Sequence, residues 1–243
     1  MISVIVPLLT AGVVKLLDVP LLVGGVILLG AVTAGSPLAL LGTEGKRGSI
    51  KLASTITALV ILFMSATVTF WLWVYSRWFP MHISISVSKL LATVAPLALT
   101  PLFMGVTLRE VLPRVSKIAQ KVLGLYSKAC ILILLVLFIV PGLLALIKFS
   151  LAEFAAILII ISLALAAGYY LGGPEVKDRI SIALAGTQCN LTALIVIAHV
   201  SYPKVHILGP LLAYIILSFL VVAAWYRFLL YRMKRRGETI DQV

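Results

Sequence analysis

Acidic residues are scarce in this sequence, and charged residues of either sign are few. Only 8 of the 243 residues are Asp or Glu, 12% of residues are charged and 62% are hydrophobic, with a mean hydropathy of +1.18. Soluble domains are about half apolar and about a quarter charged. The composition therefore excludes a separate soluble domain. It predicts an all-α, polytopic membrane protein in which residues 1–243 form a single transmembrane domain.

Cysteine is rare too, which excludes several kinds of chemistry. Cys130 and Cys189 both lie inside apolar runs, whereas a disulfide framework or a metal cluster needs more ligands at shorter spacing. The sequence has no Ser-His-Asp arrangement, and Gly172-Gly173-Pro174 lacks the Lys-Ser/Thr that ends a phosphate-binding loop. We therefore expect no enzyme, no resident cofactor and no structural metal.

Long apolar runs divide the chain into about eight expected membrane spans. A helix needs roughly 20 apolar residues to cross about 30 Å of hydrocarbon. The expected spans are residues 2–17, 21–41, 52–75, 87–108, 129–147, 151–171, 178–200 and 206–230. A longer basic connection, residues 109–128, joins the fourth span to the fifth, and a cytoplasmic basic tail, residues 231–243, ends the chain.

The net charge of +12 comes from basic residues in the short connections and the tail. No folded basic face is expected, so nucleic acid is not an expected partner. Most of the 20 Lys and Arg residues follow even-numbered spans, and basic loops stay on the cytoplasmic side of a membrane. We therefore expect a multi-pass protein of the plasma (inner) membrane with both termini cytoplasmic.

The seventh expected span has a polar middle. Residues 178–200 are long enough to cross a bilayer, yet their centre reads Gly186-Thr187-Gln188-Cys189-Asn190. Lipid offers no hydrogen-bond partner, so such a centre must face protein, water or a bound solute. A glycine beside hydroxyl and amide side chains also predicts a break in the helix. Broken helices are where secondary transporters bind substrates and ions.

The second expected span has a comparable interruption, Thr33-Ala34-Gly35-Ser36-Pro37. It precedes the seventh span by five, so the two cross the membrane in opposite directions. Each also has an apolar span on either side. Two three-helix units of opposite topology, each with an interrupted middle helix, are the pattern of an inverted-repeat transporter. The two units cover about residues 2–75 and 151–230.

Two stretches of the chain resemble one known family. Residues 179–190, followed by an apolar run, a Tyr-Pro turn and a last span with a basic tail, resemble the bile acid:sodium symporter family. So do residues 36–57, in which Ser36-Pro37 precedes a glycine-rich basic loop and the hydroxyls of Ser54 and Thr57.

The resemblance implies ten helices in two inverted five-helix repeats, with a panel and a core in which two broken helices cross. The core helices are then those at about 2–75 and 151–230, and residues 87–147 supply panel-type helices. Two helices of the family pattern that precede residue 2 are missing, so we expect a divergent or N-terminally shortened member. The family's second crossing helix also carries a glutamate five residues after its arginine, where this sequence has Leu184. Sodium coupling, which the family implies, stays open.

The candidate site follows from the two interruptions and from the hydroxyls of the third span. Their oxygens can line a solute path or hold sodium, or they can simply bond neighbouring helices. The predicted substrate- and ion-binding residues are Gly186, Thr187, Gln188, Asn190, Thr192, Thr33, Ser36, Pro37, Ser54 and Thr57. A sodium ion, if one binds, is expected at Thr187, Gln188, Asn190 and Thr57. Arg179 is expected as a cytoplasmic flank or an inner gate.

These features predict a secondary transporter that moves a small organic solute by alternating access. Net positive surroundings and half-helix N-termini at the breaks favour an anionic solute. The competing interpretation is a non-transporting membrane subunit or degenerate paralogue that packs against a partner protein. The missing helices and the missing glutamate favour that second interpretation. The lipid bilayer is the other expected partner, and the oligomeric state stays open.

Overall fold

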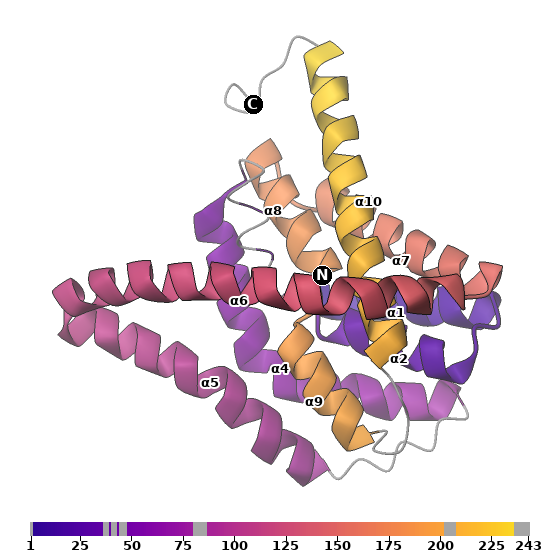
Figure 1. The fold of residues 1–243 in the computed structure, drawn as a ribbon, viewed down its shortest axis with the longest axis horizontal. Helices are drawn as coiled ribbons and strands as arrows, with labels where there is room; N and C mark the ends of the chain where they lie inside the picture. Colours follow the sequence, from indigo (N-terminus) through magenta and orange to yellow (C-terminus); the bar gives the residue numbers. More distant parts are fainter. Residues whose placement is uncertain are drawn as a thin grey trace.

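The computed structural model describes residues 2–35, 39, 43, 48–79, 87–201 and 208–235, and the named elements in these ranges are all α-helices (Figure 1). They are α1 (Ile2–Leu16), α2 (Leu21–Val32), α4 (Ile50–Trp78), α5 (Val87–Val111), α6 (Pro113–Ile147), α7 (Leu151–Tyr170), α8 (Val176–Thr187), α9 (Leu191–Ser201) and α10 (Leu208–Arg235). The all-α class predicted from composition is confirmed.

Within the described ranges, two helices are long and apolar enough to cross a membrane. They are α7 and the Gly209–Arg235 part of α10, with mean hydropathies of 2.3 and 1.9. A third candidate is α4, whose two pieces Ile50–Met64 and Ala66–Trp78 are bent by 60° relative to each other. The shorter helices α1 and α2 are also apolar. The fold is that of a membrane-embedded helical protein.

Two basic segments are more helical than the sequence suggested, and both are corrections. The expected connection 109–128 is mostly helix, because α5 continues to Val111 and α6 begins at Pro113. Proline suits the first position of a helix, where its missing N–H leaves no hydrogen bond unmade. Part of the expected tail 231–243 is helical as well, since α10 runs to Arg235. Basic side chains are stabilising beside a helix C-terminus.

The core of the bundle combines α1, α2, α4, α7, α8, α9 and α10, which share one cluster of buried apolar side chains. The helices α7 and α8 approach closely, and a Cβ on Gly168 would lie 2.4 Å from the Cα of Ala183. Small residues permit such close approach between membrane helices. In addition, the Trp71 indole N–H donates to the carbonyl oxygen of Ser3 at 2.7 Å and joins α4 to α1.

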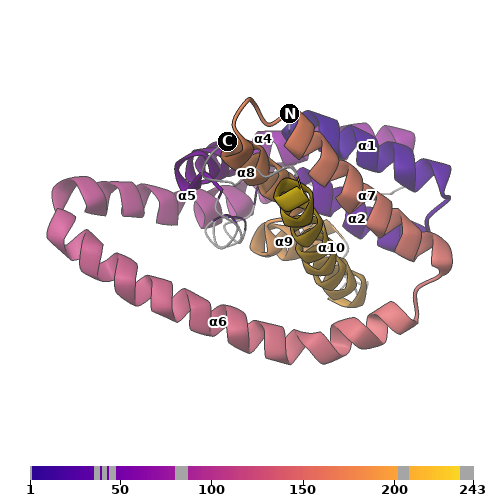
Figure 2. The same cartoon turned by 90° about the horizontal axis from the view of Figure 1, so that it is seen from above.

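A hairpin of α5 and α6 lies outside this core (Figure 2). Large apolar side chains stay exposed along it, among them Phe103, Ile118 and Leu137. The hairpin contacts the core where α6 packs against α10 and where α5 packs against α4 and α9. Helices with this kind of surface suit a lipid environment, in which exposed apolar side chains need no protein cover.

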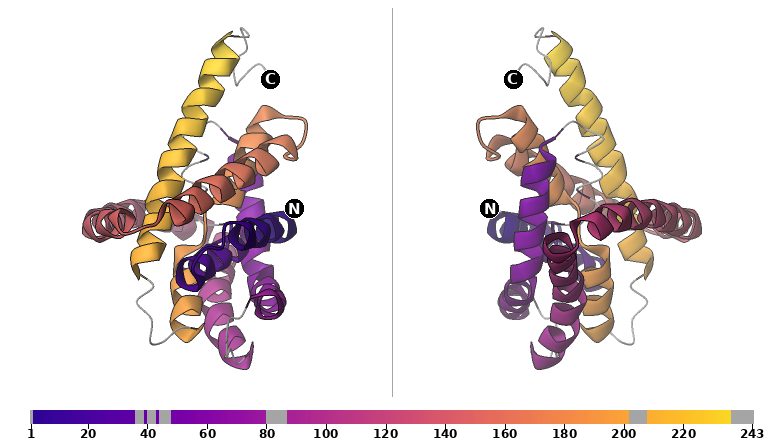
Figure 3. Two further views of the ribbon diagram at one scale, coloured as in Figure 1. Left: turned by 90° about the vertical axis from the view of Figure 1, so that its right-hand side faces the viewer. Right: turned by 90° about the vertical axis from the view of Figure 1, so that its left-hand side faces the viewer.

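The polar centre expected at residues 186–190 lies where α8 ends and α9 begins. Figures 1 and 3 show α8 and α9 following one another, with α10 beside them. On other sides, α4 packs against α8, and α2 packs against α9 and α10. The interval between α8 and α9, residues 188–190, is therefore enclosed by helices from both halves of the chain.

Candidate functional site

Two non-helical stretches, residues 33–35 and 188–190, pair with each other inside the bundle. The first follows α2, and the second separates α8 from α9. Ala34 and Cys189 form an antiparallel bridge, the arrangement found between neighbouring β-strands. Interruptions that lie far apart in the sequence are therefore in direct contact in the fold.

Backbone hydrogen bonds hold this crossing together. The amide of Asn190 donates to the carbonyl oxygen of Thr33 at 2.7 Å. The amide of Gly35 donates to the carbonyl oxygens of Ala185 and Gln188, at 2.8 and 3.1 Å. These bonds satisfy backbone groups that neither helix can satisfy internally, which is what makes irregular backbone tolerable in the interior of a protein.

Gly35 is where the crossing meets α4. Its φ of +94° lies in the left-handed region, and a Cβ added there would stand 2.8 Å from Cγ1 of Val60. Thr57 lies one turn before Val60 on α4 and is buried. Its neighbour Ile56 packs against the small apolar cluster that includes Ala185 of α8. The predicted hydroxyl of Thr57 is therefore on the part of α4 that faces the crossing.

The helices α2 and α8 end in the same way. The hydroxyl of Thr33 donates to the carbonyl oxygen of Leu29 at 2.9 Å. The hydroxyl of Thr187 donates to the carbonyl oxygen of Ala183 at 3.1 Å. Both threonines are buried, and both back-bond four residues along the chain, a pattern that competes with the helix ladder. Each therefore helps to end its helix at the crossing.

Asn190 begins the helix that follows. Its side-chain oxygen accepts a hydrogen bond from the amide of Ala193 at 3.2 Å, so it acts as the N-cap of α9. Gly186 is buried in the last turn of α8, directly before the break. Of the predicted residues, Thr33, Gly186, Thr187, Gln188 and Asn190 are thus brought together at the crossing.

Two buried side-chain oxygens differ from the others. Among the described residues, Gln188 Oε1 and Thr57 Oγ1 are the buried side-chain polar atoms without a hydrogen-bond partner. The two side chains are each 5% exposed. A buried polar group left unpaired costs about 1–3 kcal/mol. Both residues were predicted as part of an ion site from sequence, and both present an unused oxygen inside the bundle.

Of the remaining predicted binding residues, Ser54 is the one whose side chain the structure describes. Ser54 is exposed on α4, and its hydroxyl donates to the carbonyl oxygen of Lys51 at 2.9 Å. Ser36 and Pro37 lie outside the described residues, as does the side chain of Thr192. The structure therefore does not bring Ser54 to the crossing.

Arg179 lies near the start of α8, eight residues before Thr187, which places it about 12 Å along the helix from the crossing. Its Nε donates to the carbonyl oxygen of Gly173 at 2.7 Å. Its guanidinium also lies 5.9 Å from the centre of the Tyr169 ring. The side chain joins the turn before α8 to the end of α7.

Two buried polar residues of the core were not predicted. Tyr214 of α10 is buried, and its ring would lie 3.3 Å from a Cβ added at Gly30 of α2. The hydroxyl of Ser181 donates to the carbonyl oxygens of Lys177 at 2.8 Å and Ser49 at 3.2 Å. A tyrosine inside an apolar run was the available signal for the first. Nothing in the sequence brings Ser181 to Ser49.

The side chains that usually bind metals are not clustered in the described part of the chain. Within the described ranges, no group of three or more His, Cys, Asp or Glu side chains could hold a metal ion. Leu184, at the position where the family resemblance led us to expect a glutamate, is fully buried in the apolar core. Among the described residues, the side-chain oxygens that meet at the crossing are therefore neutral, those of Thr33, Thr187, Gln188 and Asn190.

An all-helical membrane protein with interrupted helices that meet in its interior has the general architecture of a secondary transporter. Residues 3–149 match the sequence model of the Sodium Bile acid symporter family. That match spans more than half of the chain, so the protein belongs to this family, which confirms the resemblance noted from sequence. No curated protein matches the sequence. The matched region contains residues 36–57 but not residues 179–190, the other stretch that carried the resemblance.

Proposed function

We propose that this protein is a secondary transporter that moves a small organic anion by alternating access around the crossing of residues 33–35 and 188–190. Membership of a symporter family supports transport as the activity. The observation that carries the location is the pair of unpartnered buried oxygens on Gln188 and Thr57. An unpaired buried polar group calls for an explanation, and a bound ion is one that fits a transporter.

Sodium is the co-transported ion in this proposal, and it is a substrate rather than a resident metal. The C-terminal ends of α2 and α8 both meet at the crossing, and a helix C-terminus carries partial negative charge that favours a cation. Oxygens of Gln188 and Thr57, with Thr187 beside them, fit an ion that accepts neutral oxygen ligands. Because Leu184 offers no carboxylate, the ion is held more weakly than a negatively charged site would hold it.

The anionic solute is proposed to bind next to the same crossing. The N-terminus of α9 begins there, and its first amides favour negative charge. An anion and a cation bound close together stabilise each other, which couples their transport. This chemistry is consistent with an organic anion such as a bile acid as the transported solute.

The proposed topology has about eight spans in an inverted repeat, with both termini cytoplasmic in the plasma membrane. The equal length of the two interrupted helices supports the repeat, since α2 and α8 each have 12 residues and each ends at a back-bonding threonine. Their stretches pair antiparallel, as two oppositely directed units would.

The test is a thermal-stability titration of the purified protein with sodium or potassium chloride at equal ionic strength. An ion that binds only the folded state raises stability by mass action. We expect a sodium-specific rise in the wild type that is lost in Gln188→Leu and in Thr57→Val. Thr55→Val is the matched control, because Thr55 is exposed on the same helix and should keep the response.

The same variants then enter an uptake assay in proteoliposomes with a labelled bile acid. Uptake that depends on a sodium gradient and fails in Gln188→Leu supports both parts of the proposal. Wild-type uptake in Gln188→Leu and Thr57→Val would refute the site.

The second candidate is a non-transporting subunit or degenerate paralogue that packs against a partner protein. The buried Leu184 favours it, because a symporter of this family would be expected to use a carboxylate there. Absence of uptake together with absence of a sodium response in the wild type would favour this candidate over transport.

A further inference from the structure

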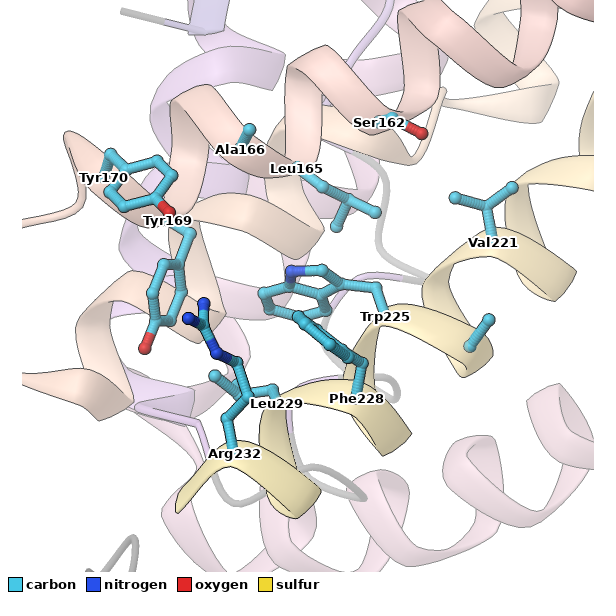
Figure 4. A pocket seen from close by; sticks show the side chains of 11 residues that line it. Ser162, Leu165, Ala166, Tyr169, Tyr170, Val221, Trp225, Phe228, Leu229 and Arg232 are labelled. Atoms are coloured by element: carbon cyan, nitrogen blue, oxygen red, sulfur yellow. The ribbon is translucent and has the colours of Figure 1, made fainter. Parts of the chain in front are cut away.

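A cavity of about 500 Å³ lies between α7 and α10, away from the crossing (Figure 4). Its lining comes from the last three turns of α7 and the last four turns of α10. Most of the wall is apolar, and Leu165 and Leu229 are its buried side chains. The only ionised side chain in the lining is that of Arg232, and no acidic residue takes part.

Aromatic rings shape this cavity. The rings of Tyr169 and Trp225 meet edge to face with centres 5.7 Å apart, and so they join α7 to α10. Phe228 completes the wall on the α10 side. Flat aromatic walls suit a hydrocarbon chain, and tyrosine and tryptophan are enriched where a membrane helix reaches the headgroup layer.

Arg232 makes one end of the cavity positively charged. The Arg232 guanidinium lies 5.4 Å from the Phe228 ring centre, and Figure 4 shows Arg232 among the side chains that line the cavity. A second guanidinium, that of Arg179, lies against the Tyr169 ring. Guanidinium groups bind phosphate through paired hydrogen bonds. The site therefore combines a phosphate-binding end with an apolar slot.

The location in the fold decides between a lipid and a soluble anion. In the described part of the chain, α7 and α10 are the unbent helices whose length and composition suit a membrane crossing, and the cavity lies in the C-terminal half of both. Basic pockets between membrane helices near the headgroup layer bind anionic lipid. A water-soluble anion would leave the apolar, aromatic part of the cavity unfilled.

We propose that this cavity binds an anionic phospholipid, with the phosphate at Arg232 and the upper part of an acyl chain along Trp225 and Leu165. The lipid bridges α7 and α10 at the membrane surface. This site is separate from the crossing, so it stands or falls independently of the transport proposal.

The experiment measures retained lipid by native mass spectrometry after exchange of the protein into vesicles of phosphatidylcholine with or without phosphatidylglycerol. We expect the wild type to retain phosphatidylglycerol in preference to phosphatidylcholine. Arg232→Gln should weaken that retention roughly fivefold, the effect of about one charge near a membrane surface. Arg235→Gln is the matched control, because Arg235 lies in the same last turn of α10 but does not line the cavity.

A second variant separates the slot from the charge. Ala224→Phe fills the lining from α10 without changing any charge, and it should also reduce retention. Equal losses in Arg232→Gln and Arg235→Gln would indicate general surface attraction and overturn the proposal. Full competition by soluble glycerol phosphate would overturn it as well, by showing a site for the headgroup alone. An unchanged elution volume in size exclusion establishes that each variant is folded.

Discussion

Buried hydroxyl groups in this protein mostly bond a carbonyl oxygen of their own helix. Among the described helices this holds for Thr10, Thr33, Ser181, Thr187 and Ser218. Such bonds satisfy the hydroxyl without help from a neighbouring helix. Thr57 and Gln188 depart from this rule, since each keeps one oxygen unpaired in the interior. At these two positions the unpaired oxygen should lower the stability of the ion-free protein and should also bind the ligand.

Replacement of Gln188 by leucine should therefore have opposite effects with and without the ion. In sodium-free buffer Gln188→Leu removes an unpaired buried oxygen, so the thermal midpoint should rise, by an amount that corresponds to about 1–3 kcal/mol. In sodium the variant should show no further rise, whereas the wild type should. Thermal denaturation in potassium and in sodium measures both effects. A variant less stable than the wild type in potassium would mean that the Gln188 oxygen is already paired in the folded protein.

The extended backbone after α2 and after α8 explains how these two helices end inside the bundle. The helices α2 and α8 are followed by extended backbone that pairs with its counterpart, so each interruption supplies the hydrogen bonds that the other needs. Gly35 allows this arrangement because its backbone is left-handed and Val60 of α4 lies where a side chain would be. The crossing therefore depends on close backbone approach as well as on polarity.

Gly35→Ala should loosen the crossing. A left-handed backbone costs an alanine about 1–2 kcal/mol, and the contact with Val60 adds a cost of about 1–3 kcal/mol. We expect a lower thermal midpoint and loss of the sodium response. Gly12→Ala is the control, because Gly12 lies in α1 with open space around it, and alanine favours a helix there. A midpoint in Gly35→Ala as high as in Gly12→Ala would contradict the crossing geometry.

The whole molecule combines a packed core with an outer hairpin of α5 and α6 (Figure 2). Its apolar outer surface and its basic helix ends are both consistent with a bilayer around it. The proposed topology places the turn between α6 and α7 outside the cell. It places the turn between α7 and α8 in the cytoplasm. These two turns lie at opposite ends of α7, a helix suited to crossing the membrane.

Thiol labelling tests this topology. In a background where Cys130 and Cys189 are replaced by serine, Lys148→Cys and Glu175→Cys introduce single exposed thiols at the two ends of α7. A membrane-impermeant maleimide added to intact cells should label position 148, and position 175 should react only after the membrane is opened. The reverse result would invert the orientation. Labelling of both positions from outside would exclude α7 as a span.

The sequence by itself determined the class of this protein, because composition and hydrophobic runs depend on each residue's own chemistry. It predicted the all-α membrane fold, the family, and the break at residues 186–190, where a glycine adjoins hydroxyl and amide groups. Nothing local could distinguish Ser54 from Thr57. They lie three residues apart on α4, yet one is exposed and the other buried. Only packing against other helices decides which hydroxyl enters the core.

The tertiary structure also decided the pairing of residues 33–35 with 188–190 and the cavity between α7 and α10. Both bring together residues that are distant along the chain, and such contacts are set by the packing of whole helices. The helical start of α6 at Pro113 was decided there as well. The basic residues after it read as a loop when charge alone is considered, but their backbone continues a helix that packs on α10. Local chemistry therefore fixed which segments are apolar and where one helix breaks, and long-range packing fixed which oxygens are buried together.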